Sequence, residues 1–76
     1  MLLDSESLEI LVTIASRGIG QWISPQAISQ ETGIKPLRAD YLAKQLAKAG
    51  YVKSDSDGDY WLIEKGQAFL VENNLA

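Results

Sequence analysis

The sequence predicts an α+β fold in which three helices precede a β-hairpin and a fourth helix follows it. Apolar residues recur at helical spacing in three segments of residues 5–49. Two short runs rich in β-branched and aromatic residues then flank an Asp-Gly pair, and a last helical stretch comes after them. A chain of 76 residues can build one hydrophobic core, so we expect a single domain over residues 1–76.

The first helix is predicted from about Ser5 to Ser16. Ser5 and Ser7 provide the start signal, and Arg17-Gly18 supplies the positive charge and the permissive backbone of a helix end. Its apolar residues form two faces, one with Leu8, Leu11, Val12 and Ala15 and the other with Ile10 and Ile14. This arc is wider than one core contact needs. Its surplus side, with Leu2-Leu3, is a candidate partner surface.

The second helix is predicted over residues 25–31, between two boundary signals. Ser24 caps it, Pro25 takes its first position, and Gly33 can adopt the left-handed conformation that ends a helix. The preceding Gln21-Trp22-Ile23 is too short for more than one β-bridge. The residues expected to face inward are Ala27, Ile28 and Thr32.

The third helix is predicted from Pro36 to Ala49, and Gly50 ends it. Its buried stripe, at i, i+3, i+4 and i+7 spacing, consists of Ala39, Leu42, Ala43, Leu46 and Ala49. Two helices joined by a short turn that contains glycine, the second helix longer than the first, are typical of a helix-turn-helix.

A β-hairpin is predicted after the third helix. Its strands are Tyr51–Ser54 and Tyr60–Ile63, and the polar segment between them contains the turn pair Asp57-Gly58. A last helix is predicted over residues 64–72, ending near Asn73-Asn74. The hairpin extends the helix-turn-helix to a winged form.

The aromatic residues of the hairpin have two interpretations. Large aromatics in so small a domain usually pack in the core or on the sheet, and the alternative is a platform on which bases stack. Side chains alternate along a strand, so Tyr60 and Trp61 should face opposite ways and one of them should be exposed. If Tyr60 is the exposed one, we expect Trp22 to join it in a surface patch.

Three short sequence motifs carry a resemblance to a known family. They are Ile28 with Thr32-Gly33-Ile34, Leu42 and Leu46 leading into Lys48-Ala49-Gly50-Tyr51-Val52, and Glu64-Lys65-Gly66. With this order of elements, the chain resembles the winged helix-turn-helix superfamily of transcription regulators over nearly its whole length. It is also similar to the very small regulators of fimbrial operons at Ala39, Tyr41 and Lys48-Ala49-Gly50. The resemblance implies a three-helix core, a β-hairpin wing and a C-terminal helix, but such a fold does not fix a function.

Positive charge is concentrated on and just after the third helix. Residues 35–53 hold five basic residues against one acidic residue, Asp40, a net charge of +4. The rest of the chain holds two basic and nine acidic residues, a net charge of −7. Most affinity for duplex DNA comes from Lys and Arg side chains that neutralise phosphates. We therefore expect double-stranded DNA as the partner and the helix over residues 36–49 as the element that reads it.

The candidate DNA-binding residues face away from the buried stripe of this helix. They are Lys35, Leu37, Arg38, Tyr41, Lys44, Gln45 and Lys48. The resemblance implies that the N-terminal ones approach base edges in the major groove and the later ones approach phosphates. Arg38 is the candidate for a bidentate bond to guanine, Gln45 for adenine and Tyr41 for a phosphate. The alternative for Lys44 and Lys48 is the solvated face of an ordinary helix.

Two features argue against DNA binding. The chain is acidic, with a net charge of −3, and nucleic-acid-binding domains are usually basic. Asp55, Asp57 and Asp59 lie at the predicted wing tip, where phosphate would repel them. The alternative function is a winged-helix protein interaction module without direct DNA binding. Its protein partner, or a second copy of the chain, would bind through the helix over 5–16 or through the C-terminal helix.

The composition argues against catalysis and against metal or cofactor chemistry. The chain has no His and no Cys, so Ser-His and Cys-His pairs and thiolate zinc sites are excluded. The segment that starts at Asp55 does not match a calcium loop, because its twelfth position is Gly66 and not an acidic residue. We expect no enzymatic activity, no cofactor and no small-molecule substrate.

The sequence gives no sign of a membrane or a secretory pathway. The start, Met1-Leu2-Leu3, runs directly into acidic residues and lacks the features of a signal peptide. Apolar runs fall short of the roughly 20 residues that a membrane-spanning helix needs. We expect a cytoplasmic protein with no membrane contact.

Overall fold

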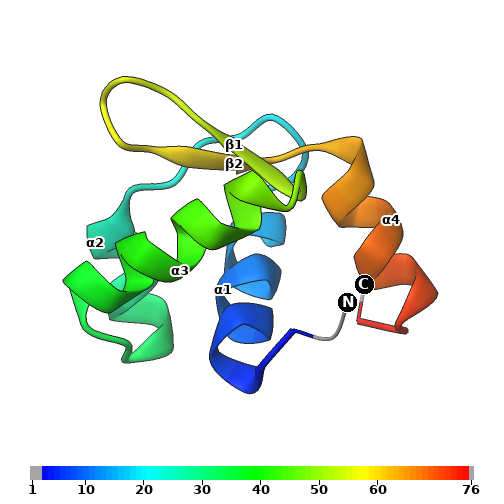
Figure 1. Ribbon diagram of the computed structural model, residues 1–76, viewed down its shortest axis with the longest axis horizontal. Helices are drawn as coiled ribbons and strands as arrows, with labels where there is room; N and C mark the ends of the chain where they lie inside the picture. Colours follow the sequence, from blue (N-terminus) through cyan, green and yellow to red (C-terminus); the bar gives the residue numbers. More distant parts are fainter. Residues whose placement is uncertain (1–2, 76) are drawn as a thin grey trace.

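The computed structural model describes residues 3–75 and places a two-stranded hairpin across a group of helices (Figure 1). The elements are α1 (Ser5–Ala15), α2 (Pro25–Thr32), α3 (Pro36–Lys48), β1 (Val52–Ser54), β2 (Tyr60–Leu62) and α4 (Glu64–Glu72). The α+β class predicted from the sequence is confirmed, and the arrangement is consistent with a winged helix-turn-helix layout. Each helix begins and ends within one residue of its predicted boundary.

α1 begins at a cap that the sequence signals did not identify. The backbone N–H of Ser7 donates to Asp4 Oδ1 at 2.7 Å, so Asp4 is the N-cap in place of the serines that follow it. The carboxylate satisfies one of the unpaired N–H groups of the first turn and interacts favourably with the helix dipole. Its pKa is lowered by this hydrogen bond to Ser7.

The apolar residues of α1 divide differently from the prediction. Leu11 is buried together with Ile10 and Ile14, so these three form one core face. Val12 is exposed and Leu8 is half-buried, which leaves the predicted surplus apolar side on the surface. Leu2, which was assigned to this side, lies outside the described residues.

α2 and α3 are joined by a short turn that contains Gly33, as predicted. Ser24 Oγ accepts from the backbone N–H of Ala27 at 3.2 Å, and Gly33 ends α2 with a φ of 79°. The predicted stripe of α3 is buried at Ala39, Leu42, Ala43 and Leu46, and α3 packs against α1, α2 and β1.

Among residues 3–75, no helix is long and apolar enough to cross a bilayer.

The chain between α1 and α2 joins the edge of the hairpin. β1 and β2 pair antiparallel, with Val52 opposite Leu62. Ile23 bridges Tyr60 through two backbone hydrogen bonds of 2.8 and 3.0 Å, as predicted for a single bridge. A second bridge, Ile19 to Leu62, was not predicted. The hairpin is therefore tied at two points, Ile19 and Ile23, to the connection between α1 and α2.

Tyr60 is not the exposed member of the Tyr60–Trp61 pair, so the surface patch that would have joined it to Trp22 does not form. Tyr60 is buried, its neighbour Trp61 is half-buried, and Trp22 is exposed without Tyr60 beside it on the surface. The alternation of the two strand residues holds, because Trp61 faces the other way and is the more exposed of the two. Burial of Tyr60 is possible because its hydroxyl finds a hydrogen-bond partner on α3.

α4 packs closely on the chain that links α3 to β1. A Cβ atom at Gly66 would clash with the Tyr51 carbonyl oxygen and lie 2.7 Å from Leu62 Cδ1, so only glycine fits. Phe69 packs on the ring of Tyr51 with centroids 4.9 Å apart. Lys65 Nζ donates to the Ala49 carbonyl at 2.9 Å, which satisfies an end group of α3.

We predict that Gly66→Ala destabilises the protein by about 1–3 kcal/mol or more, because the added methyl group forces α4 away from the backbone of Tyr51. Urea unfolding would measure the change in the free energy of unfolding. Ala68→Ser, at an exposed position of the same helix, is the control and should change it by about 0.5 kcal/mol or less. Equal stability of Gly66→Ala and the wild type would contradict the packing.

Candidate nucleic-acid interface

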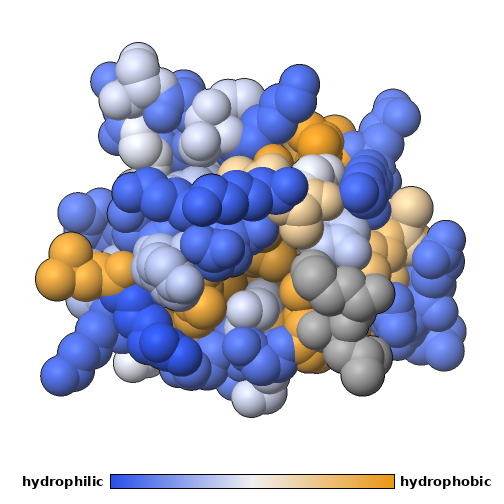
Figure 2. Space-filling view, viewed as in Figure 1, coloured by the Kyte–Doolittle hydropathy of each residue, from blue (hydrophilic) through white to orange (hydrophobic). Residues whose placement is uncertain are grey.

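The outward face of α3 carries a continuous strip of exposed side chains. Residues spaced by four, three and four positions lie on one face of a helix, and here they are Leu37, Tyr41, Lys44 and Lys48, which we call the α3 strip. Leu37 is 89% exposed and Tyr41 is 58% exposed. Figure 2 shows hydrophilic side chains over most of this helix and an apolar projection at its N-terminal end. The strip therefore combines apolar and cationic groups.

The other predicted site residues flank this strip. Lys35 and Arg38 are exposed, and Gln45 is half-buried. Lys35 is the residue immediately before α3, where it precedes Pro36 and makes no side-chain cap. All seven predicted residues thus lie on or beside the outward face of one helix, although Gln45 has less of its side chain available than the rest.

Arg38 is held by α1. Its Nε and Nη2 atoms both donate to Glu6 Oε1, at 3.0 and 2.7 Å. The bonds to Glu6, followed by the charge of that carboxylate and a weaker contribution from Asp4, raise the pKa of Arg38. The two side chains are 54% and 43% exposed, so solvent screens the pair and its strength is modest. The Nη1 group and one N–H of Nη2 make no bond to Glu6, and the assignment of Arg38 to guanine stays a prediction.

Asp40 links α3 to the hairpin. Its Oδ1 atom accepts from the Tyr60 hydroxyl at 2.7 Å, and its Oδ2 atom lies 2.9 Å from Lys44 Nζ. The hydrogen bond from Tyr60 lowers the pKa of Asp40 most, burial opposes that change, and Lys44 lowers the pKa further. Burial and the Asp40 carboxylate raise the pKa of the Tyr60 hydroxyl strongly. Asp40 is therefore a structural residue whose charge Lys44 compensates.

Of the five basic residues in 35–53, three lysines are not compensated by a carboxylate. Within the described part of the chain, Lys35, Lys48 and Lys53 take part in no salt bridge, whereas Arg38 and Lys44 do. All three are exposed. They lie at the start of α3, at its end and on β1, so positive charge brackets the helix at its two ends.

The hairpin tip contributes negative charge next to the start of α3. Asp55 Oδ1 accepts from the backbone N–H groups of Asp57 and Asp59 at 3.0 and 3.1 Å, which shapes the turn. Asp57 also lines a shallow concavity of about 270 Å³ together with Leu37 and Asp40. Among residues 3–75, no group of acidic residues has the arrangement of a metal site.

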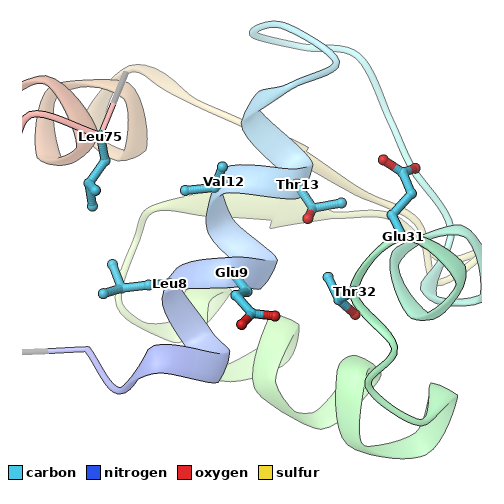
Figure 3. Close-up of a pocket in the computed structure, with 7 residues that line it drawn as sticks. All are labelled: Leu8, Glu9, Val12, Thr13, Glu31, Thr32 and Leu75. Atoms are coloured by element: carbon cyan, nitrogen blue, oxygen red, sulfur yellow. The ribbon is translucent and has the colours of Figure 1, made fainter.

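A second concavity, of about 340 Å³, lies along α1, between the end of α2 and Leu75 (Figure 3). Its lining consists of Leu8, Glu9, Val12, Thr13, Glu31, Thr32 and Leu75. In Figure 3, Leu75 points toward the side of α1 that carries Leu8 and Val12, and Glu31 and Thr32 lie across from it on α2. This groove contains the surplus apolar side of α1 that the sequence predicted.

The sequence analysis missed two residues outside α3 whose side chains bond to residues of α3 at the candidate interface. Glu6 is separated from Arg38 by 32 positions and Tyr60 from Asp40 by 20 positions, so no local pattern pairs them. One signal existed for Tyr60, because a tyrosine in a short central strand needs a partner for its hydroxyl. No comparable signal marked Glu6.

Comparison with models of known protein families, with curated proteins and with solved structures gave no match.

We predict that Tyr60→Phe lowers the free energy of unfolding by about 1–2 kcal/mol at neutral pH, because it removes a hydrogen bond to a charged carboxylate. The folded-state pKa of Asp40 lies below its ordinary value of 3.8, so this contribution is present above that value and is lost as the pH falls through the folded pKa. Urea unfolding at a series of pH values from neutral into acid should show the difference between the two proteins shrinking only below pH 3.8.

Tyr51→Phe is the matched control for this prediction. Tyr51 is also buried, and its hydroxyl forms no hydrogen bond with the described residues. It should therefore change stability little and without this pH dependence. An equal loss for both variants at every pH would show that the bond to Asp40 contributes nothing.

Proposed function

We propose that this chain is a winged helix-turn-helix domain that binds double-stranded DNA with α3 in the major groove. The observation that carries the proposal is the α3 strip, a row of exposed side chains on a helix whose opposite face is fully committed to the core. A major groove about 12 Å wide admits one α-helix, and a helix-turn-helix presents its second helix in this way. The resemblance to winged-helix regulators supports the same assignment.

The charge distribution sets the expected strength of this binding. Lys35, Lys48 and Lys53 are available for phosphates at once, and Lys44 becomes a fourth contact if it leaves Asp40. The carboxylates at the hairpin tip stand on the same side as the start of α3, so the tip of the wing adds no attraction beyond that of Lys53 on β1. We therefore infer that α3 binds DNA with few phosphate contacts and with little help from the wing.

The groove beside α1 favours a second candidate function, a protein interaction module. Its apolar wall, which includes the exposed Val12, would accept the apolar face of a helix from another protein. Glu9 lies on the rim and forms no ion pair within the described residues, so a helix with flanking Lys or Arg is the complementary occupant. If two copies of the chain met through this groove, the Glu9 carboxylates on the two rims would repel each other, so a basic partner helix fits better than a second copy. Saturable binding of such a helix, without DNA binding, would select this candidate.

We predict that binding to a duplex of about 20 base pairs falls steeply with salt, with a slope of log K against log salt between about −2.7 and −3.6 for three to four phosphate contacts. Lys48→Ala should reduce the magnitude of this slope by about one. Fluorescence anisotropy at a series of salt concentrations measures both. Arg17→Gln removes one positive charge from a residue already paired with Glu31, far along the chain from α3, and should leave the slope unchanged. Absence of salt-sensitive binding at micromolar protein would refute the proposed function.

We predict that Glu6→Gln strengthens DNA binding by up to about fivefold, because the Glu6 carboxylate restrains the Arg38 guanidinium through an exposed, solvent-screened ion pair. Glu9→Gln is the matched control, since it removes the same charge from an exposed position of α1 that does not bond to Arg38. The same titration measures both variants. An equal effect of the two substitutions would mean that only net charge matters and that Glu6 does not restrain Arg38.

A further inference from the structure

Leu37 is the most exposed large apolar residue of the described chain, at 89%. A single exposed leucine is ordinary on a protein surface, so exposure alone carries no conclusion. The position of Leu37 at the start of α3 is the observation that points to a function. Leu37 is the second residue of α3, and the N-terminal residues of a recognition helix are the ones that approach base edges.

Two cationic side chains of α3 near Leu37 are engaged within the protein, whereas Lys35, which precedes the helix, takes part in no salt bridge with the described residues. Arg38 bonds to Glu6, and Lys44 pairs with Asp40, so neither points freely at a base edge. Tyr41 follows Leu37 by one helical turn on the same strip. The first two turns of α3 therefore offer the groove an apolar and an aromatic surface in place of free guanidinium or ammonium groups.

The major groove contains one apolar group that such a surface can recognise. Thymine carries a methyl group on C5, whereas the corresponding edges of guanine, adenine and cytosine carry hydrogen-bonding groups. The carboxylates of Asp40 and Asp57 line the same concavity as Leu37. The Asp40 carboxylate is already bonded to the Tyr60 hydroxyl and to Lys44, so the apolar contact of Leu37, and not these carboxylates, provides the selectivity.

From this geometry we infer that Leu37 is a specificity-determining residue that reads the 5-methyl group of a thymine. The inference rests on the proposed DNA binding and adds to it the base that the start of α3 selects. Leu37 contributes by apolar contact with the methyl group, because the apolar surfaces of both groups are removed from water when they meet.

The test uses duplexes enriched from a random library by the full-length protein. Each thymine of the enriched site is replaced in turn by uracil, which removes only the methyl group and keeps every hydrogen-bonding edge. Burial of one methyl group corresponds to about a fourfold change in affinity. We expect wild-type protein to lose about fourfold at one or two thymine positions and Leu37→Ala to bind the thymine and uracil duplexes equally.

Tyr41→Ala is the matched control, because it removes an exposed side chain from the same strip and leaves the Leu37 side chain in place. It should weaken binding to both duplexes and retain the thymine preference at the Leu37 position. Leu37 is so exposed that its replacement should leave the free energy of unfolding unchanged, which urea unfolding checks.

The outcomes separate the two proposals. Uracil tolerated at every position, or a uracil penalty of equal size in wild type and Leu37→Ala, would overturn the thymine assignment and leave DNA binding intact. Absence of any salt-dependent binding to duplex DNA would overturn both. A penalty present in wild type and Tyr41→Ala but lost in Leu37→Ala would establish the assignment.

Discussion

The hydrogen bond between the Tyr60 hydroxyl and Asp40 joins the hairpin to α3. A hydroxyl buried without a partner would cost a large fraction of the stability of so small a chain, so Tyr60 can occupy the core only where Asp40 meets it. The backbone of the same residue forms both hydrogen bonds of the bridge to Ile23. One residue thus sets the position of the hairpin against α3 and against the connection between α1 and α2.

This link has a consequence for the charge of the exposed helix. Asp40 is placed on α3 by a structural need, and its second oxygen takes Lys44 as a partner. The carboxylate would otherwise repel phosphate, and Lys44 cancels that repulsion at the expense of one available cation. Arg38 is compensated in the same way by Glu6 from α1. The centre of α3 is therefore nearly neutral, and uncompensated charge remains at its ends.

Local patterns were enough to predict the helices and the hairpin. Ser24, Pro25, Gly33 and Pro36 act on the backbone next to them, and the apolar spacing of α3 follows directly from helical geometry. The outward residues of α3 followed from the same spacing. The sequence could not predict the long-range pairs, because nothing in the neighbourhood of Glu6 or Tyr60 specifies the helix face that packs against it. The misplaced cap of α1 has a smaller cause, since Asp4 and the serines after it are all good N-cap residues.

For the proposed DNA binding, a nearly neutral α3 surface on an acidic domain affects specificity more than affinity. Phosphate contacts attract a protein to all DNA sequences alike, so a domain with many free cations gains mostly non-specific binding. In the proposed binding mode, only the lysines around the ends of α3 provide this attraction, and the hairpin carboxylates reduce it. Base contacts then make up a larger share of the total binding free energy. A single apolar contact, such as that of Leu37, can distinguish sequences by a factor that matters biologically because the competing non-specific term is small.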